Sequence, residues 1–238
     1  LLNATRHRLA PVNPSISLQH PLADPPAGNG FASQVAVLGI GLMGLPMASR
    51  LCQAGLSVSA WNRTRAKAER LAAQGARVSP TPVDAVAQAD VILISLEDGP
   101  AVESVLFQLG TAEKLRPGSV VIDMSSIPPR QARDHAARLG ALGVHHIDAP
   151  VSGGTLGAEQ GTLAIMVGGK ADVFDRVNPL LALLGHATHV GSHGAGQLAK
   201  LANQMIVGVT IGAVAEALLL CERGGANMAK VKEAITGG

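Results

Sequence analysis

The stretch VLGIGLMG, residues 37–44, decides the fold. Its glycines, Gly39, Gly41 and Gly44, follow the pattern G-x-G-x-x-G. A short apolar strand precedes them, and a helical pattern follows at 45–55. In this context the first glycine makes a tight turn, the second lets the backbone approach a pyrophosphate, and the third lets helix and strand pack closely. The stretch therefore predicts a dinucleotide-binding loop, to which Ile40, Leu42 and Met43 also belong.

Strand-like and helical patterns then alternate in units of about 30 residues. The expected strands are 34–40, 56–61, 90–96, 119–125 and 144–150, and the expected helices are 45–55, 65–75 and 128–143. The strands are continuously apolar, which is typical of a sheet covered by helices on both faces. The pattern predicts an α/β fold with a Rossmann-type, doubly wound parallel sheet.

The pattern changes after residue 190. A long helix is expected over 195–222, and a second begins after Asn227, a plausible N-cap. The apolar run 205–221 falls short of the ~20 residues that a membrane span needs and carries Thr210 and Glu216. We therefore expect it to be part of a buried helix and predict no membrane association.

Residues 1–30 differ from the rest, because they hold five of the 14 prolines and no apolar periodicity. Disorder is the simplest interpretation. We divide the chain into a disordered leader or tail (1–30), an NAD(P)-binding Rossmann domain (31–192), and a long interdomain helix with the start of an all-helical domain (193–238).

Composition argues against several kinds of partner. A net charge of +2 gives no reason to invoke nucleic acid, and three Phe, one Trp and no Tyr leave little for base stacking. Two distant cysteines suggest no disulfide framework, so a reducing compartment, the cytoplasm, is expected. His186, His189 and His193 lie close in sequence, but without a cysteine and with few nearby carboxylates we predict no metal site.

The end of the second expected strand bears on the choice of cofactor. An NAD site commonly has an acidic residue there, which binds the ribose 2′-OH. This chain has no acid between Ser57 and Ala68, and it offers Asn62, Arg63 and Thr64 as donors to a 2′-phosphate. The sequence favours NADP over NAD.

Two polar side chains interrupt the apolar start of the long helix. Lys200 and Asn203 in QLAKLANQ (197–204) are one turn apart and project from one face. A cation among such neighbours either extends to water along its apolar stem or is held for a purpose.

Four blocks together resemble the β-hydroxyacid dehydrogenase family, of the 3-hydroxyisobutyrate dehydrogenase and tartronate semialdehyde reductase type. They are GIGLMGLPMASRL, VIDMSSI, DAPVSGGTLGAEQGTLAIMVGG and GAGQLAKLANQMIVG. The resemblance runs from about Phe31 to Gly238. It implies hydride transfer between NADP(H) or NAD(H) and a short 3-hydroxy acid or its semialdehyde, in a homodimer or homotetramer assembled through the helical domain.

The resemblance also implies roles for single residues. Lys200 matches the family's catalytic acid/base. The residues implied in substrate binding are Ser125, Ser152, Gly153, Gly154 and Asn203, and those implied at the cofactor, besides the glycine loop and 62–64, are Leu96 and Ser126. The family usually has proline after the leucine, whereas this chain has Glu97.

Family members continue with further helices, so the resemblance implies a C-terminally truncated chain. Two other hypotheses stay open at this point. One is a catalytically impaired dinucleotide-binding module. The other is an imine reductase-like enzyme, which shares the glycine loop and WNRT, although the pair of Lys200 and Asn203 argues against it.

Overall fold

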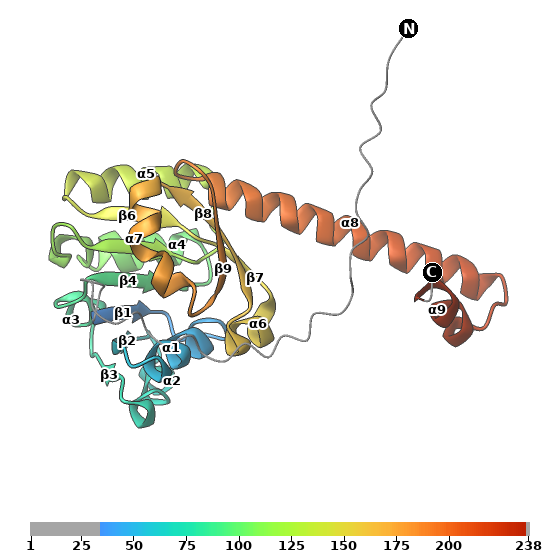
Figure 1. The fold of residues 1–238 in the computed structure, drawn as a ribbon, viewed down its shortest axis with the longest axis horizontal. Coiled ribbons are helices and arrows are strands. Elements are labelled where there is room, and N and C mark those ends of the chain that lie inside the picture. Colours follow the sequence, from blue (N-terminus) through green and yellow to red (C-terminus); the bar gives the residue numbers. More distant parts are fainter. Residues whose placement is uncertain (1–33, 237–238) are drawn as a thin grey trace, which may run out of the picture.

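The structure, a computed structural model, describes residues 34–236. The leader or tail expected at 1–30 lies outside the described residues. Within them the chain forms one nine-stranded sheet with helices on both faces, and a long helix leaves this sheet domain near β8 (Figure 1). This arrangement confirms the predicted α/β fold.

The strands are β1 (Gln34–Leu38), β2 (Ser57–Trp61), β3 (Arg77–Val78), β4 (Val91–Ile94), β5 (Val120–Asp123), β6 (His145–Asp148), β7 (Val151–Ser152), β8 (Leu163–Gly169) and β9 (Gly185–Gly191). Their order is β3-β2-β1-β4-β5-β6-β8-β7, with β9 beside β8. The first six strands are parallel and follow the Rossmann order, which reverses between β1 and β4.

The α-helices are α1 (Gly44–Gln53), α2 (Arg65–Glu69), α3 (Pro82–Val86), α4 (Gly99–Glu103), α5 (Pro129–Ala141), α6 (Gly154–Gln160), α7 (Ala171–Leu181), α8 (Ala195–Arg223) and α9 (Met228–Thr236). The chain also has two short 3-10 helices, η1 (Ala72–Gln74) and η3 (Ala112–Lys114), and a π-helix, η2 (Ser104–Gln108). The Asn227 side chain accepts a hydrogen bond from the Lys230 N–H (3.2 Å), so the expected N-cap of α9 is confirmed.

Two hydrophobic clusters lie on opposite faces of the sheet. Val35 and Val37 of β1 belong to one cluster, whereas Ala36 and Leu38 belong to the other. Successive side chains of a strand point to opposite faces, so an entirely apolar strand serves both clusters. This explains why the parallel strands read as unbroken apolar runs.

The sheet is not parallel throughout. β8 runs antiparallel to β6 and β7. The connection from β7 to β8 holds the seven-residue α6 and is too short for a parallel crossover, which needs a dozen or more residues. The helix expected at 65–75 is also interrupted, since α2 and η1 are separate and the break places Leu71 fully inside the core.

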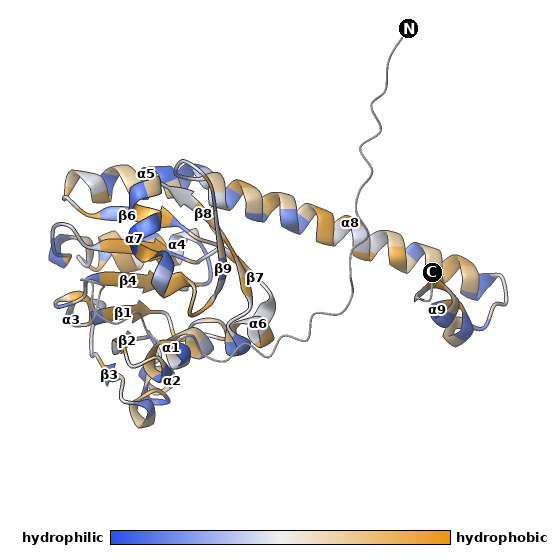
Figure 2. Cartoon of the chain, in the orientation of Figure 1, coloured by the Kyte–Doolittle hydropathy of each residue, from blue (hydrophilic) through white to orange (hydrophobic). Residues whose placement is uncertain are grey.

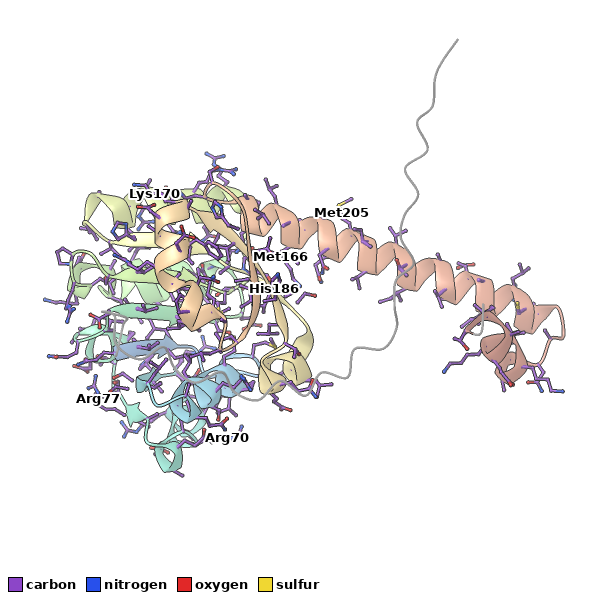
Figure 3. All side chains as sticks on the ribbon, viewed as in Figure 1. Arg70, Arg77, Met166, Lys170, His186 and Met205 are labelled. Atoms are coloured by element: carbon purple, nitrogen blue, oxygen red, sulfur yellow. The ribbon has the colours of Figure 1, made fainter. Side chains whose placement is uncertain are left out.

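The expectation of a buried helix at 205–221 is wrong. α8 follows the predicted bounds, but beyond its first turn most of its side chains are exposed, and Met205 is 71% exposed (Figure 3). The apolar residues of α8 lie along a helix that stands clear of the sheet domain (Figure 2). Within the part of the chain that the structure describes, α8 is the one helix long and apolar enough to cross a membrane.

Two buried carboxyl groups lie side by side where β5 and β6 end. Asp123 and Asp148 are register partners and have no exposed surface. Asp148 accepts hydrogen bonds from the backbone N–H groups of Gly194 (2.7 Å) and Gln197 (3.0 Å) at the start of α8. Burial raises the pKa of Asp123 to about 7, with the Asp148 charge adding to the effect and hydrogen bonds from Ser125 opposing it. Asp123 is therefore largely protonated just below neutral pH.

We predict that the free energy of unfolding of the wild-type chain falls as the pH rises from about 4 to about 7, and that Asp123→Asn removes this fall. The raised folded-state pKa means that the folded chain holds a proton that the unfolded chain loses above about pH 4, so stability declines from there to about pH 7. A shift from 3.8 to about 7 corresponds to about 4 kcal/mol. Urea unfolding at several pH values across this range measures the pH dependence of the free energy of unfolding. Asp175→Asn, at an exposed position on α7, should keep the wild-type slope, and an unchanged slope in Asp123→Asn would contradict the assignment.

Candidate active site

The glycine turn lies where the strand order reverses. Gly39 follows β1 with φ +101°, a conformation that favours glycine, and its N–H donates to the Trp61 carbonyl (2.9 Å). A side chain at Gly39 would collide with the Ser95 carbonyl beyond β4, and one at Gly44 would collide with the Gly39 carbonyl. The loops after β1 and β4 and the start of α1 are thus in close contact.

The middle glycine faces open space. A Cβ at Gly41 would meet no atom within 4 Å, and no side chain caps the start of α1. Neighbouring Leu42 is strongly exposed, and Met43 packs against the core. Free N–H groups at the start of a helix attract phosphate, so the structure has both the space and the donors that a pyrophosphate needs.

Asn62 joins the loop after β2 to the glycine turn. Its Oδ1 accepts from the Ile40 N–H (3.0 Å), and its Nδ2 donates to the Thr64 carbonyl (2.9 Å). The side chain is therefore engaged within the protein, and the geometry favours a positioning role over the donor role expected for it. Arg63 and Thr64 are exposed beside it.

Ser125 links the loops after β4 and β5. Its buried hydroxyl accepts from the Leu96 N–H (3.0 Å), and its own N–H donates to the Asp123 carboxylate (3.0 Å). Ser126 and Glu97 are exposed on either side. The serine predicted to touch substrate thus supports the loop beside the glycine turn, and Ser126 is the more accessible of the two.

Polar residues of α8 meet the end of β7. Asn203 Nδ2 donates to the Ser152 hydroxyl (3.5 Å), at the long limit of a hydrogen bond. Gln204 Oε1 accepts from both Lys200 Nζ (2.9 Å) and Asn203 Nδ2 (3.1 Å). The structure therefore brings Lys200 and Asn203 together through Gln204, and Asn203 links them to Ser152.

Gly153 and Gly154 follow β7 with φ values of +131° and +63°. Lys200 is half-buried, and partial burial lowers the pKa of its ammonium group. The direction of the shift is the one that proton exchange near neutral pH requires.

Two glutamines in this region were not predicted from the sequence. Gln204 lies four residues after Lys200, a spacing that places both on one face of a helix and could have indicated it. Gln197 is 1% exposed and donates from Nε2 to the Ser125 carbonyl (2.8 Å). Nothing in its apolar sequence context distinguishes it from a surface glutamine.

Other features do not enlarge the site. Over residues 34–236, no group of three or more His, Cys, Asp or Glu side chains is placed to hold a metal ion. His146 is buried, which lowers its pKa to about 3, so it stays neutral. A depression lined by Ser49, Arg50, Arg70 and Glu159 lies beside α1 and contains none of the predicted site residues.

The site residues come from the loops after β1, β2, β4 and β5, from the end of β7 and from the start of α8. The parallel strands bring the first four loops to one edge of the sheet. Ligands of open α/β sheets bind at this edge, where the strand order reverses. Together with a partly buried lysine of lowered pKa, the arrangement is typical of a dinucleotide-dependent oxidoreductase.

Comparison with known sequences identifies the family. Residues 34–194 match the NAD binding domain of 6-phosphogluconate dehydrogenase, and residues 194–238 match the NAD-binding segment of NADP-dependent 3-hydroxyisobutyrate dehydrogenase. The chain belongs to the β-hydroxyacid dehydrogenase family, as its sequence blocks predicted, and is an NAD(P)-dependent hydroxyacid dehydrogenase by class.

Three similar proteins illustrate the relationship. The 2-hydroxy-3-oxopropionate reductase of Escherichia coli is 42% identical, over 86% of this chain and 70% of the relative. The structure of 3-hydroxyisobutyrate dehydrogenase from Mycobacterium tuberculosis with L-serine is 37% identical with a TM-score of 0.81, over 86% of this chain and 70% of that one. An imine reductase from Myxococcus stipitatus with NADP+ is 27% identical with a TM-score of 0.78, over 85% and 71%. This chain spans 62 to 72% of the length of the curated relatives compared.

We predict that Gly41→Ala weakens NADPH binding about tenfold or more without lowering the melting temperature, because the added methyl group enters the open space above the turn. Gly44→Ala should lower both binding and melting temperature, since its methyl group collides with the Gly39 carbonyl. Fluorescence titration and thermal unfolding measure the two quantities. Gly140→Ala, at an open position in α5, serves as the control. Normal binding by Gly41→Ala would refute this position for the pyrophosphate.

Proposed function

We propose that the protein transfers hydride between NADP(H) and a short 3-hydroxy acid or its semialdehyde. The best candidates are 2-hydroxy-3-oxopropionate and 3-hydroxyisobutyrate, the substrates named for its relatives. The observation that carries the proposal is the convergence of Lys200, Gln204, Asn203 and Ser152. The division at residues 31–192 and 193–238 and a cytoplasmic location belong to the same proposal.

Lys200 supplies the proton chemistry. The nicotinamide, when bound, provides or takes the hydride. Reduction of a carbonyl leaves a developing alkoxide, to which the Lys200 ammonium donates a proton, and oxidation requires the reverse transfer. Partial burial makes this ammonium a better acid than an exposed lysine. Gln204 Oε1 holds its nitrogen in place.

The loop at 152–154 binds the substrate carboxylate. The Ser152 hydroxyl and the backbone N–H groups of Gly153 and Gly154 are suitable donors, and glycines let a ligand approach the backbone closely. Asn203 holds Ser152 from the side of α8 and orients the substrate between this loop and Lys200.

The loops after β1, β2, β4 and β5 would hold the cofactor at this edge of the sheet. Residues 39–44 would bind its pyrophosphate, and Leu96 and Ser126 would border the nicotinamide. Arg63 is exposed and can bind a 2′-phosphate in a bidentate manner, which supports a preference for NADP. NAD is the alternative.

A second copy of the chain covers the exposed apolar surface of α8 in a homodimer or homotetramer. The side chains of this surface include Leu201, Met205, Ile206, Val209 and Ile211, all more than half exposed. A contiguous apolar surface of this kind is typical of an interface. Sedimentation equilibrium measures the oligomeric state. A monomer at micromolar concentration would contradict this part of the proposal.

We predict that Lys200→Ala reduces kcat by about 100-fold or more while NADPH affinity changes little, because the proton donor is lost and the cofactor contacts remain. The assay follows NADPH absorbance with 2-hydroxy-3-oxopropionate and 3-hydroxyisobutyrate as substrates. Lys114→Ala, an exposed position in η3, serves as the control. A loss confined to KM would contradict proton transfer by Lys200. NADPH binding without turnover of any hydroxy acid or semialdehyde would instead favour a non-catalytic module.

We also predict that Arg63→Ala weakens NADPH binding about tenfold or more and leaves NADH binding within about twofold, since only NADPH carries the 2′-phosphate. Calorimetric titration with both cofactors measures the difference. Arg65→Ala nearby, where the arginine pairs with Glu69, serves as the control. Equal weakening of both cofactors would show that Arg63 does not select NADP.

A further inference from the structure

Gln197 occupies an unusual position one helical turn before Lys200. It is 1% exposed, and its amide is satisfied at both ends. Nε2 donates to the Ser125 carbonyl (2.8 Å), and Oε1 accepts from the Ile127 N–H (3.1 Å). One side chain of α8 therefore holds both ends of the segment 125–127 that follows β5.

The held segment is itself tied to the cofactor side of the site. The Ser125 hydroxyl accepts from the Leu96 N–H (3.0 Å), so the loop after β4 is one hydrogen bond away from the segment. The loop after β4 in turn contacts the glycine turn through Ser95 and Gly39. A continuous path of contacts runs from the glycine turn to Gln197.

The first turn of α8 has little freedom to move relative to the sheet. Asp148 accepts from the Gly194 and Gln197 N–H groups, and a side chain at Gly196 would collide with the Met166 carbonyl. Lys200 follows about 4.5 Å further along the helix axis. Any displacement of the segment 125–127 must therefore either break the bonds of Gln197 or move the turn that carries Lys200.

We propose that Gln197 is a positioning residue, which couples occupancy of the dinucleotide site to the placement of Lys200. The inference rests on the proposed function, in which the loop after β4 borders the nicotinamide and Lys200 transfers the proton. Glutamine suits this position because it offers a donor and an acceptor on one planar group. An apolar replacement leaves a buried carbonyl and a buried N–H unpaired.

The test compares Gln197→Met with Gln131→Met, each a loss of a side-chain amide at similar volume. Gln131 donates to the Gly99 carbonyl (2.9 Å) from α5 and has no contact with α8 in the hydrogen bonds of residues 34–236. Hydrogen exchange with and without NADPH reports coupling, and steady-state kinetics report catalysis. We expect NADPH to slow exchange at residues 195–204 about fivefold or more in wild type and Gln131→Met.

In Gln197→Met the same protection should be lost, although NADPH still binds within about threefold of wild type. We expect kcat to fall about tenfold and KM to change less than about threefold, which a merely structural defect would not produce. Gln197→Glu is the second variant, should Gln197→Met fail to fold. It keeps an acceptor for Ile127, and it loses the donor to Ser125 once its carboxyl group is ionised, so the loss of coupling should appear as the pH is raised.

Wild-type protection of 195–204 retained in both Gln197 variants would overturn the inference and leave the proposed function intact. A wild-type chain that binds no NADPH would overturn the proposed function instead. Hydrogen exchange of the protein without NADPH still tests the hydrogen bond between the Ile127 N–H and Gln197 Oε1. Gln197→Met should speed exchange of the Ile127 amide about tenfold or more, whereas an unchanged rate would show that the bond is not made.

Discussion

The buried carboxylate of Asp148 joins the sheet to the helix that carries the lysine. It ends β6, lies beside Asp123, and accepts two N–H groups from the start of α8. A buried charge is tolerated when hydrogen bonds and a helix N-terminus compensate for lost hydration. Asp148 uses both of its carboxyl oxygens for these N–H groups, and burial beside it raises the pKa of Asp123 to about 7. The placement of the rest of the site depends on this contact.

The site is assembled from supports as well as from reacting groups. Asn62 holds the glycine turn, Ser125 holds the loop after β4, and Gln204 holds Lys200. Each of these side chains uses its polar atoms within the protein, whereas Arg63 and Ser126 beside them are exposed. Polar residues that are neighbours in the sequence thus have different roles. Those bonded within the protein shape the site, and those that are exposed can bind a ligand.

The sequence predicted the parallel strands, the glycine turn and the long helix, because apolar runs and glycine spacing follow from local geometry. The expected strands did not include β8, whose antiparallel direction depends on the short connection through α6. It placed the apolar part of α8 in a core, because hydropathy alone does not show whether an apolar helix is buried or exposed within the chain. The roles assigned to Lys200, Asn203 and Ser152 stay predictions. The role of Gln197 was not predicted, because its hydrogen-bond partners, Ser125 and Ile127, are about 70 residues away in the sequence.

Because α8 is long, a small tilt at its base displaces its far end by a large distance. Twenty-nine helical residues extend about 43 Å, and the hydrogen bonds described above hold α8 to the sheet domain only at its start, between Gln197 and Asn203. A tilt of about 5° at this base displaces the far end by about 4 Å, close to the width of a side chain. Even a tilt that leaves the hydrogen bonds at the base intact is therefore amplified with distance. A segment that packs against the far end of α8 is displaced by several ångströms when the base tilts by a few degrees.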